Sequence, residues 1–283
     1  MFGSHLSIAG GMHNALLSAE KLSCETVQVF TKNQKMWKCP PLGEAEVGEW
    51  KSHAKRLKFK QTVSHDSYLI NLASPDEVMW RKSVELFIEE VNRCATLGIP
   101  YLVTHPGAHM GQGEEAGITR IVAAMDVVLD ATPDAKNVTV CLEATAGQGS
   151  SIGHRLEHLA EIMDRVKTPK RFGVCLDTAH LFAAGYDFRG RKYRTFRKEL
   201  DDVVGLKRVK VLHVNDSKKD LGSRVDRHEH IGRGLIGIEG FRPWVRDDAF
   251  RDVPKILETE KGECPDTKRD WDAINLEVLR GLL

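Results

Sequence analysis

Short apolar runs alternate with longer amphipathic stretches along the whole chain. Most of the short runs are nearly continuous in apolar side chains, which is typical of strands buried on both faces of a parallel sheet. The longer stretches repeat their apolar positions with the period of an α-helix. The expected strands are residues 6–8, 27–30, 61–64, 101–104, 138–142, 172–176, 209–214 and 255–257, and the clearest expected helices are residues 83–97, 118–129 and 156–166.

This alternation predicts the architecture. Strands that alternate with helices form parallel sheets, because each helix returns the chain to the edge where the previous strand began. Eight strand–helix units close into a barrel, and a barrel of about 250 residues is commonly one domain. The chain has 283 residues and shows no linker or low-complexity tract. We therefore expect an α/β protein, a TIM (β/α)8 barrel, in which residues 1–283 form a single domain.

Side chains of the types that bind metal ions come at the ends of most predicted strands. In a barrel these ends meet on one face, where active sites are built. Because side chains alternate along a strand, Cys141, Cys175, Val209 and Val211 are expected to fill the barrel beneath them. Burying polar side chains at the strand ends without partners would cost free energy. Bound cations would remove that cost. The strand-end residues are His65, His105, Glu143, Asp177, His213 and Glu258.

Three further ligand-type residues lie just beyond the strand ends. His180 follows Asp177 in the turn into the next helix, and Asp226 and His228 alternate in the loop after the seventh strand. Nine such residues are more than one or two ions need, because an ion takes about three or four protein ligands. Histidine and carboxylate without cysteine favour zinc, with manganese as the alternative at one or more sites. We expect three Zn²⁺ ions per chain.

The charge of this site indicates the class of substrate. Three divalent ions outweigh the four carboxylates, so the site is locally positive in a chain whose net charge is only +1. Clustered metal ions suit a phosphate, because they hold the attacking and leaving oxygens of an in-line displacement. The near balance of 41 basic and 40 acidic residues argues against a protein that coats nucleic acid by bulk charge.

Composition also indicates the compartment. No apolar run is long enough to span a membrane, and the N-terminal residues lack the pattern of a secretory leader. The six cysteines form no CxxC pair, which fits structural thiols in a reducing compartment. We expect a cytoplasmic protein.

Several stretches resemble the endonuclease IV family of apurinic/apyrimidinic (AP) endonucleases, also called AP endonuclease family 2. The similarity extends over nearly the full length. The most specific matches are HDSYLINLA at 65–73, GVCLDTAH at 173–180, and HVNDSK at 213–218 with DRH at 226–228. Shorter matches are SHLS at 4–7, FTKNQ at 30–34, THPG at 104–107, EATAGQG at 143–149 and LET at 257–259. The resemblance implies a TIM barrel of the xylose-isomerase-like type.

The resemblance also implies how three zinc ions are held. The first two ligand sets share one carboxylate, that of Glu143, which we therefore assign as the catalytic residue. The implied sets are His65, His105 and Glu143; Glu143, Asp177, His213 and Glu258; and His180, Asp226 and His228.

The activity implied by the resemblance is that of deoxyribonuclease IV, a hydrolase acting on ester bonds. Such an enzyme cuts the phosphodiester 5′ to an abasic site in duplex DNA and leaves a 3′-hydroxyl and a 5′-deoxyribose phosphate, as a step of base excision repair. We also expect removal of 3′-blocking groups by phosphatase or phosphodiesterase activity. The expected partner is double-stranded DNA with abasic or 3′-blocked lesions. We expect a bacterial-type monomer that associates with the nucleoid through this DNA.

The loops after the second and third strands are expected to meet the DNA. Lysines there suit phosphates, and aromatic side chains can enter the base stack and hold the abasic nucleotide flipped out. Two residues depart from the family pattern: Ala179 replaces a common Cys, and Lys35 replaces a common Arg, which loses a planar stacking group. The expected DNA-binding residues are Lys32, Asn33, Gln34, Lys35, Trp37, Tyr68 and Arg227.

Two other functions compete with this interpretation. A sugar isomerase or epimerase on a related barrel needs the Glu, Asp, His and Glu ligands of the later strands, but it does not need His65, His180, Asp226 or His228. A non-catalytic binder of damaged DNA would call for lost ligands, and all nine are present. We also expect Asp66 and Asp216 to orient ligand histidines through hydrogen bonds.

Overall fold

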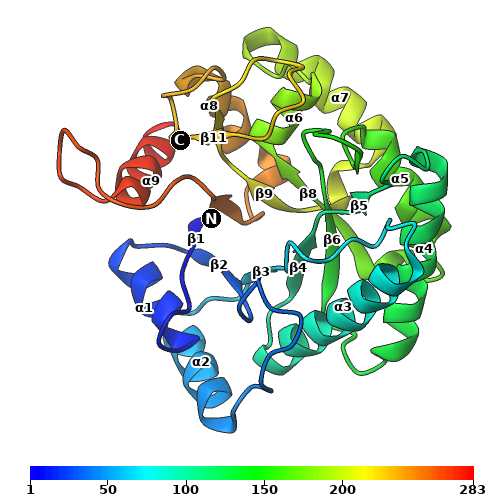
Figure 1. Ribbon diagram of the computed structural model, residues 1–283. Coiled ribbons are helices and arrows are strands. Elements are labelled where there is room, and N and C mark those ends of the chain that lie inside the picture. The colour runs from blue at the N-terminus through cyan, green and yellow to red at the C-terminus, as the bar shows by residue number, and fades with distance from the viewer.

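Eight parallel strands close into a barrel in the computed structural model, which describes residues 1–283 (Figure 1). Each strand pairs in parallel with two neighbours, and the first strand closes the ring against the last. The TIM barrel predicted from the sequence is confirmed. Around the ring the strands are β1 (Phe2–His5), β2 (Thr26–Phe30), β3 (Val63–His65), β4 (Tyr101–Thr104), β6 (Thr139–Glu143), β8 (Phe172–Asp177), β9 (Val209–His213) and β12 (Lys255–Leu257).

Helices surround the barrel and cover its outer face (Figure 1). None of them is both long enough and apolar enough to cross a bilayer. They are α1 (His13–Lys21), α2 (Glu44–Arg56), α3 (Glu77–Leu97), α4 (Glu114–Ala131), α5 (Leu156–Arg165), α6 (Thr178–Ala184), α7 (Tyr193–Val203), α8 (Ile238–Arg246) and α9 (Trp271–Gly281).

Short elements complete the loops. Two antiparallel pairs form in the loops that follow barrel strands: β5 (Gly107–Ala108) with β7 (Ser151–Ile152), and β10 (Asp216–Ser217) with β11 (His228–Glu229). Single 3-10 turns lie at η1 (Pro169–Arg171), η2 (Gly190–Lys192), η3 (Leu206–Arg208) and η4 (Asp248–Phe250).

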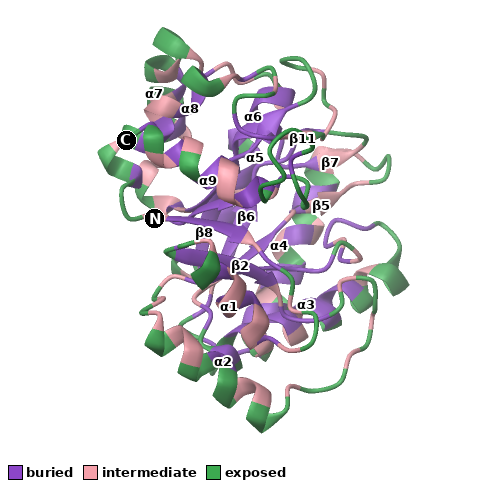
Figure 2. Cartoon of the chain, turned by 90° about the vertical axis from the view of Figure 1, so that its left-hand side faces the viewer, coloured by how far each residue is buried: buried purple, intermediate pink, exposed green.

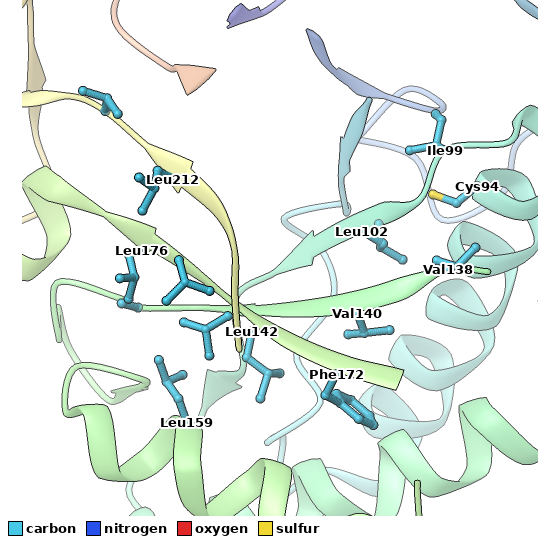
Figure 3. Packing of buried hydrophobic residues seen from close by; sticks show 14 of the residues in the cluster. Cys94, Ile99, Leu102, Val138, Val140, Leu142, Leu159, Phe172, Leu176 and Leu212 are labelled. Atoms are coloured by element: carbon cyan, nitrogen blue, oxygen red, sulfur yellow. The ribbon is translucent and has the colours of Figure 1, made fainter. Parts of the chain in front are cut away.

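The core has two separate parts. The larger part lies between the strands and the helices, where apolar side chains of the two layers interlock (Figure 3). The smaller part fills the inside of the barrel and consists of Val63, Val103, Cys141, Cys175, Val211 and Ile256. Three of these were expected there from the alternation of side chains, whereas Val209, also expected inside, packs in the larger part. Burial is greatest in the strands and least on the outer helix faces (Figure 2), and all six cysteines are free.

The predicted position of the first strand was wrong. The strand is β1, at Phe2–His5, and not residues 6–8. Its sequence has few apolar side chains, because Gly3 packs directly against the backbone of Thr26 and the Ser4 hydroxyl donates to the Leu257 carbonyl. The strand is therefore defined by its neighbours in the barrel and not by its own hydrophobicity.

The helix boundaries also differ from those expected. The predicted helix 83–97 begins earlier, at Glu77, because the Asp76 side chain caps it by accepting the Met79 backbone N–H at 2.8 Å. The first turns of this helix are exposed, so their apolar periodicity is weak.

Substitution of Gly3 tests how closely the barrel closes. A Cβ at this position would lie 2.1 Å from the Thr26 carbonyl oxygen, so the backbone must move. We expect Gly3→Ala to lower the free energy of unfolding by about 1–3 kcal/mol. Gly48→Ala is the matched control: this glycine lies inside α2 with open space around it, and the change should raise the same quantity by about 0.5–1 kcal/mol. Denaturant unfolding measures both, and equal effects would contradict the account.

Candidate metal centre

The barrel delivers the predicted ligands to one mouth. His65, Glu143, Asp177 and His213 are the last residues of β3, β6, β8 and β9, as expected. His105 and Glu258 follow β4 and β12 directly. Three others come from beyond the strands: His180 lies in α6, Asp226 lies in the loop between β10 and β11, and His228 begins β11. The structure therefore brings all nine residues together.

Glu143 lies at the centre of this cluster and is fully buried. Its Oε2 lies 3.1 Å from the Nε2 of His65 and 3.3 Å from the Nε2 of His105. Its Oε1 lies 3.0 Å from the Nδ1 of His213, and that nitrogen also lies 3.0 Å from the Oε2 of Glu258. One carboxylate thus faces two groups of donors, and the ligand atoms within each group lie within 4.8 Å of one another.

The third group is built on a helix cap. The Asp177 carboxylate accepts the His180 backbone N–H at 2.9 Å, which caps α6 and fixes where its first turn points. The Nε2 of His180 lies 3.2 Å from Asp226 Oδ2, and the Nε2 of His228 lies 3.4 Å from Asp226 Oδ1 and 3.5 Å from Asp177 Oδ2. Asp177 therefore borders the third group as well as the second.

Four of the five ligand histidines have a second contact that fixes one ring nitrogen. Such a contact sets the tautomer, so the other nitrogen is left to accept a cation. The fixing contacts are His65 Nδ1 to the Asp66 carbonyl (3.0 Å), His180 Nδ1 to the Ala144 carbonyl (3.0 Å), His213 Nε2 to Gln28 Oε1 (2.8 Å) and His228 Nδ1 to the Glu258 carbonyl (3.3 Å).

Two residues that contact the ligands were missed at the level of sequence. Gln28 accepts from His213 and donates to Glu258 Oε1 at 2.5 Å. His5, at the end of β1, lies 3.2 Å from the same carboxylate oxygen. A polar residue between Val27 and Val29 in a buried strand was the available indication of Gln28. His5 could not be recognised as a strand end because the strand itself was misplaced.

The two aspartates expected to orient ligand histidines behave differently. Asp66 lies 3.5 Å from His65 Nδ1 and accepts from the Thr104 hydroxyl at 2.6 Å. Asp216 instead accepts four backbone N–H groups, including those of Gly232 and Gly234. The expectation for Asp216 was wrong: this carboxylate holds the shape of the loop after β9 and does not hold an imidazole.

The residues fit divalent cations. The Nε2 atoms of His180 and His228 are buried and have no hydrogen-bond partner, although both lie close to carboxylate oxygens. Buried polar atoms without partners are rare in folded proteins, and a bound ion is one common reason for them. Imidazoles and carboxylates in groups of three or four are the donor set that zinc prefers.

The charges of the metal-free site offset one another. Burial raises the pKa of the Glu143 carboxyl, but His213 and His105 hold that pKa well below its usual range. Burial lowers the pKa of His180, but the Asp177 charge and the Asp226 contact raise it well above normal. In the metal-free protein, attraction between His180 and the carboxylates beside it therefore favours the charged form of each. A bound divalent ion would neutralise the carboxylates in place of that proton.

The expected DNA-binding loops open onto the same cavity as the metal groups. This cavity has a volume of about 1100 Å³ and is bordered by Glu258 and His228 on one side. The other side carries Lys32, Asn33, Gln34, Lys35 and Tyr68. Arg227 borders a second, smaller cavity of about 220 Å³ together with His105, His180 and Asp226. Tyr68 is 65% exposed, so its ring projects into solvent at the edge of the site.

Two residues of the loop after β2, Lys32 and Trp37, contact the protein interior and not solvent alone. The Lys32 ammonium is buried and donates to the Met36 carbonyl at 2.7 Å. Its Nζ also lies 3.9 Å from Oε1 of the buried Glu90. We assign Lys32 to the support of the loop and not to a phosphate. Trp37 is half-buried against the core, whereas Met36 is 49% exposed. Met36 and Tyr68 are thus the apolar groups free to meet a base stack.

Comparison with known proteins identifies the family. A family model described as "Xylose isomerase-like TIM barrel" matches residues 16–281. A probable endonuclease 4 of Chloroflexus aurantiacus is 48% identical over 283 residues, which cover 100% of this chain and 98% of the relative. A probable endonuclease 4 of Geobacter sulfurreducens is 47% identical over 99% of this chain and 94% of its own length.

The chain belongs to the endonuclease IV family. The crystal structure of endonuclease IV from Thermus thermophilus agrees, with a TM-score of 0.88 and 36% identity over 99% of this chain and 98% of that one. The family and the enzyme class predicted from the motifs are confirmed. A D-tagatose 3-epimerase-like protein, 17% identical with a TM-score of 0.73 over 99% of this chain and 96% of its own, shares the fold alone.

The stability of the metal-free protein should depend on pH through His65. Burial lowers its pKa, but Glu143 outweighs burial and raises it to about 9. A raised pKa stabilises the fold below the unfolded value of about 6.5, and this stabilisation is lost as the pH rises through about 9. We expect the free energy of unfolding to fall by about 1–3 kcal/mol across this window. Denaturant unfolding of chelator-treated protein measures it.

Two comparisons isolate this effect. His65→Gln should remove much of the slope between about pH 6.5 and 9. Protein reloaded with zinc should lose the slope too, because the metal has displaced the proton. An identical slope in the variant would assign the effect to other groups.

Proposed function

We propose that this protein is a zinc-dependent AP endonuclease that hydrolyses the phosphodiester 5′ to an abasic site in duplex DNA. The product ends would be a 3′-hydroxyl and a 5′-deoxyribose phosphate. The observation that carries the proposal is the position of Glu143, whose two oxygens face separate groups of donors while a third group lies beside them. Such an arrangement suits a phosphate whose attacking and leaving oxygens both need stabilisation.

The nine residues would hold three zinc ions. Bound zinc would lower the pKa of water, neutralise the phosphate and stabilise the leaving oxygen. The ligand sets we propose are His65, His105 and Glu143; Glu143, Asp177, His213 and Glu258; and His180, Asp226 and His228. In the third set Asp226 faces both histidines, whereas the group whose donor atoms all lie within 4.8 Å of one another has Asp177 in place of Asp226.

The protein's own side chains perform the remaining tasks. Gln28 and His5 hold Glu258 in place, and Gln28 also sets the tautomer of His213. The walls of the barrel exclude water beneath the site, since Cys175 and Val211 fill the interior. Charged groups in such a dry environment act on a phosphate more strongly than they would in water.

DNA would approach across the loops that follow β2 and β3. The exposed Lys35 suits a phosphate, and the exposed Tyr68 can enter the base stack next to an abasic nucleotide. These two residues border the cavity that contains Glu258 and His228, so a nucleotide flipped out of the duplex would reach the metal groups. Asn33, Gln34 and Arg227 complete the proposed contact surface.

Further properties follow from the same site. We propose that the enzyme also removes 3′-blocking groups, because these are phosphate esters of the same kind. We also propose that residues 1–283 act as one catalytic unit, as a monomer in the bacterial cytoplasm, associated with the nucleoid through its DNA substrate. Manganese remains the alternative metal at one or more positions.

Removal of the central carboxylate tests the reaction. Glu143→Gln keeps the size of the side chain and removes the charge that two donor groups face. We expect incision of a duplex with one abasic analogue to fall by about a hundredfold or more, and bound zinc to fall from about three per chain. Gel analysis of the cut strand and elemental analysis of the same sample measure the two effects.

Controls separate the competing functions. Chelator treatment of the native protein should abolish cutting, and zinc should restore it. Three metals without cutting would point to a damage-binding protein or to another phosphoester. Turnover of a ketose by a protein with one metal would instead support a sugar epimerase.

The role of the loop is tested by Lys35→Met. We expect DNA binding to weaken about five- to tenfold at low salt, and the dependence of binding on salt to fall by about one unit of slope. Bound metal and the maximal rate should be unchanged, because Lys35 touches no ligand. Lys51→Met, on the exposed face of α2, is the matched control. Equal effects of the two changes would place the DNA elsewhere.

A further inference from the structure

The last helix of the chain contacts the loop that carries the third ligand group. This helix, α9, lies beside β1 at the edge of the barrel (Figure 1). Its sequence contains no ligand-type motif, and the family motifs end at Thr259. Yet its first two turns contain three buried polar or aromatic residues, namely Trp271, Asp272 and Asn275. Buried polar side chains on an outer helix need partners, and these partners lie at the mouth of the barrel.

Asn275 connects two ligand-bearing segments. Its Oδ1 accepts the Ile231 backbone N–H at 3.0 Å, in the segment that follows His228. Its Nδ2 lies 3.1 Å from the Thr259 hydroxyl oxygen, directly after Glu258, and 3.1 Å from the Nδ1 of His230. One amide therefore fixes the spacing between the chain around His228 and the chain around Glu258.

Trp271 holds the same segment by stacking. Its ring stacks on the His230 imidazole, nearly parallel at a centroid distance of 3.8 Å, and the Arg233 guanidinium lies over the Trp271 ring, 4.6 Å from its centroid. Such stacked contacts are attractive beyond the area that they bury. The segment 230–233 thus contacts one indole through both of its end residues.

A charged contact fixes the helix itself. The Lys261 ammonium bonds both carboxylate oxygens of Asp272, at 2.8 and 2.9 Å, and donates to the Ser4 hydroxyl at 2.6 Å. The first turn of α9 is therefore tied to β1 and to the chain just after Glu258. These contacts make α9 part of the support of the site and not only part of the outer layer.

We propose that α9 positions the third metal group and that Asn275 is its positioning residue. This inference rests on the proposed function, since it concerns the ligands of that site. His228 is the ligand that loss of this support affects most. Its Nδ1 lies 3.3 Å from the Glu258 carbonyl oxygen. The direction of its Nε2 therefore depends on the spacing between the chain around His228 and the chain around Glu258. Loss of the Asn275 bridge releases that spacing and weakens the third site selectively.

Metal content of Asn275→Ala tests this directly. The full-length protein is loaded with Zn²⁺, freed of unbound metal and analysed for zinc per chain. We expect about three for the native chain and about two for the variant. Amide hydrogen exchange on the metal-free proteins should be faster in the variant around Ile231, which loses its acceptor, by about tenfold.

Leu279→Ala is the matched control within the same helix. Leu279 is fully buried in the last turns of α9, so its truncation destabilises the fold without touching the segment after His228. This variant should keep about three zinc ions. Equal zinc loss in both variants would show that general destabilisation, and not positioning, empties the third site, and would overturn the inference.

A measurement on the unmodified chain avoids any folding defect of the variants. If α9 supports the third group, binding of the third ion must in turn stabilise α9, because coupling is reciprocal. Exchange should slow in residues 271–275 when zinc rises from two to three per chain, with residues 278–281 unchanged. No slowing in 271–275 would overturn the inference. A native chain that binds fewer than three zinc ions would instead reject the proposed function.

Discussion

Buried charge at the mouth of the barrel is the constraint on which the rest of the structure depends. Glu143, Asp177 and His213 are fully buried, and Glu258 is largely covered. Carboxylates in such a place are stable only beside positive groups. The His213 imidazole lies beside all three of these carboxylates, and divalent ions would supply further positive charge when bound. The arrangement of strands, caps and loops serves to bring these opposite charges to the same place.

The barrel and its loops divide this work. Strand ends fix the backbone of the first two donor groups, since strand pairing places Glu143 beside Cys175 and Asp177 beside His213. The third group has no such frame and depends on local devices. These are the Asp177 cap on α6, the backbone contacts of Asp216, and the contacts made by α9. The third group is consequently the part of the site most sensitive to changes far from the ligands.

The substrate side of the site shows a similar division. Lys32 uses its charge inside the protein, where it donates to the Met36 carbonyl, and Lys35 is exposed to solvent. Trp37 packs on the core and fixes the base of the loop, which leaves Met36 and Tyr68 exposed at its edge. Rigid support beneath a few exposed groups lets a loop present contacts with little loss of conformational entropy on binding.

The sequence by itself determined the barrel and the identity of the nine candidate ligands. Apolar runs that end on His65, Glu143, Asp177 and His213 are local features, and a parallel barrel gathers all strand ends on one face, so their meeting followed from the pattern alone. The extent of β1 could not be predicted from the sequence pattern. Gly3 and Ser4 fit their positions through contacts with β2 and β12 and not through hydrophobicity. Only the tertiary structure decided which residues support the ligands. The supporting residues make their contacts with residues that are distant in the chain, and no periodic pattern in the sequence predicts such pairs. They are Gln28, His5 and Asn275. Lys32 and Lys35 stand three positions apart in one basic loop, and only burial distinguishes the internal charge from the exposed one. A side chain's type is written in the sequence, but its partner and its access to water are properties of the folded chain.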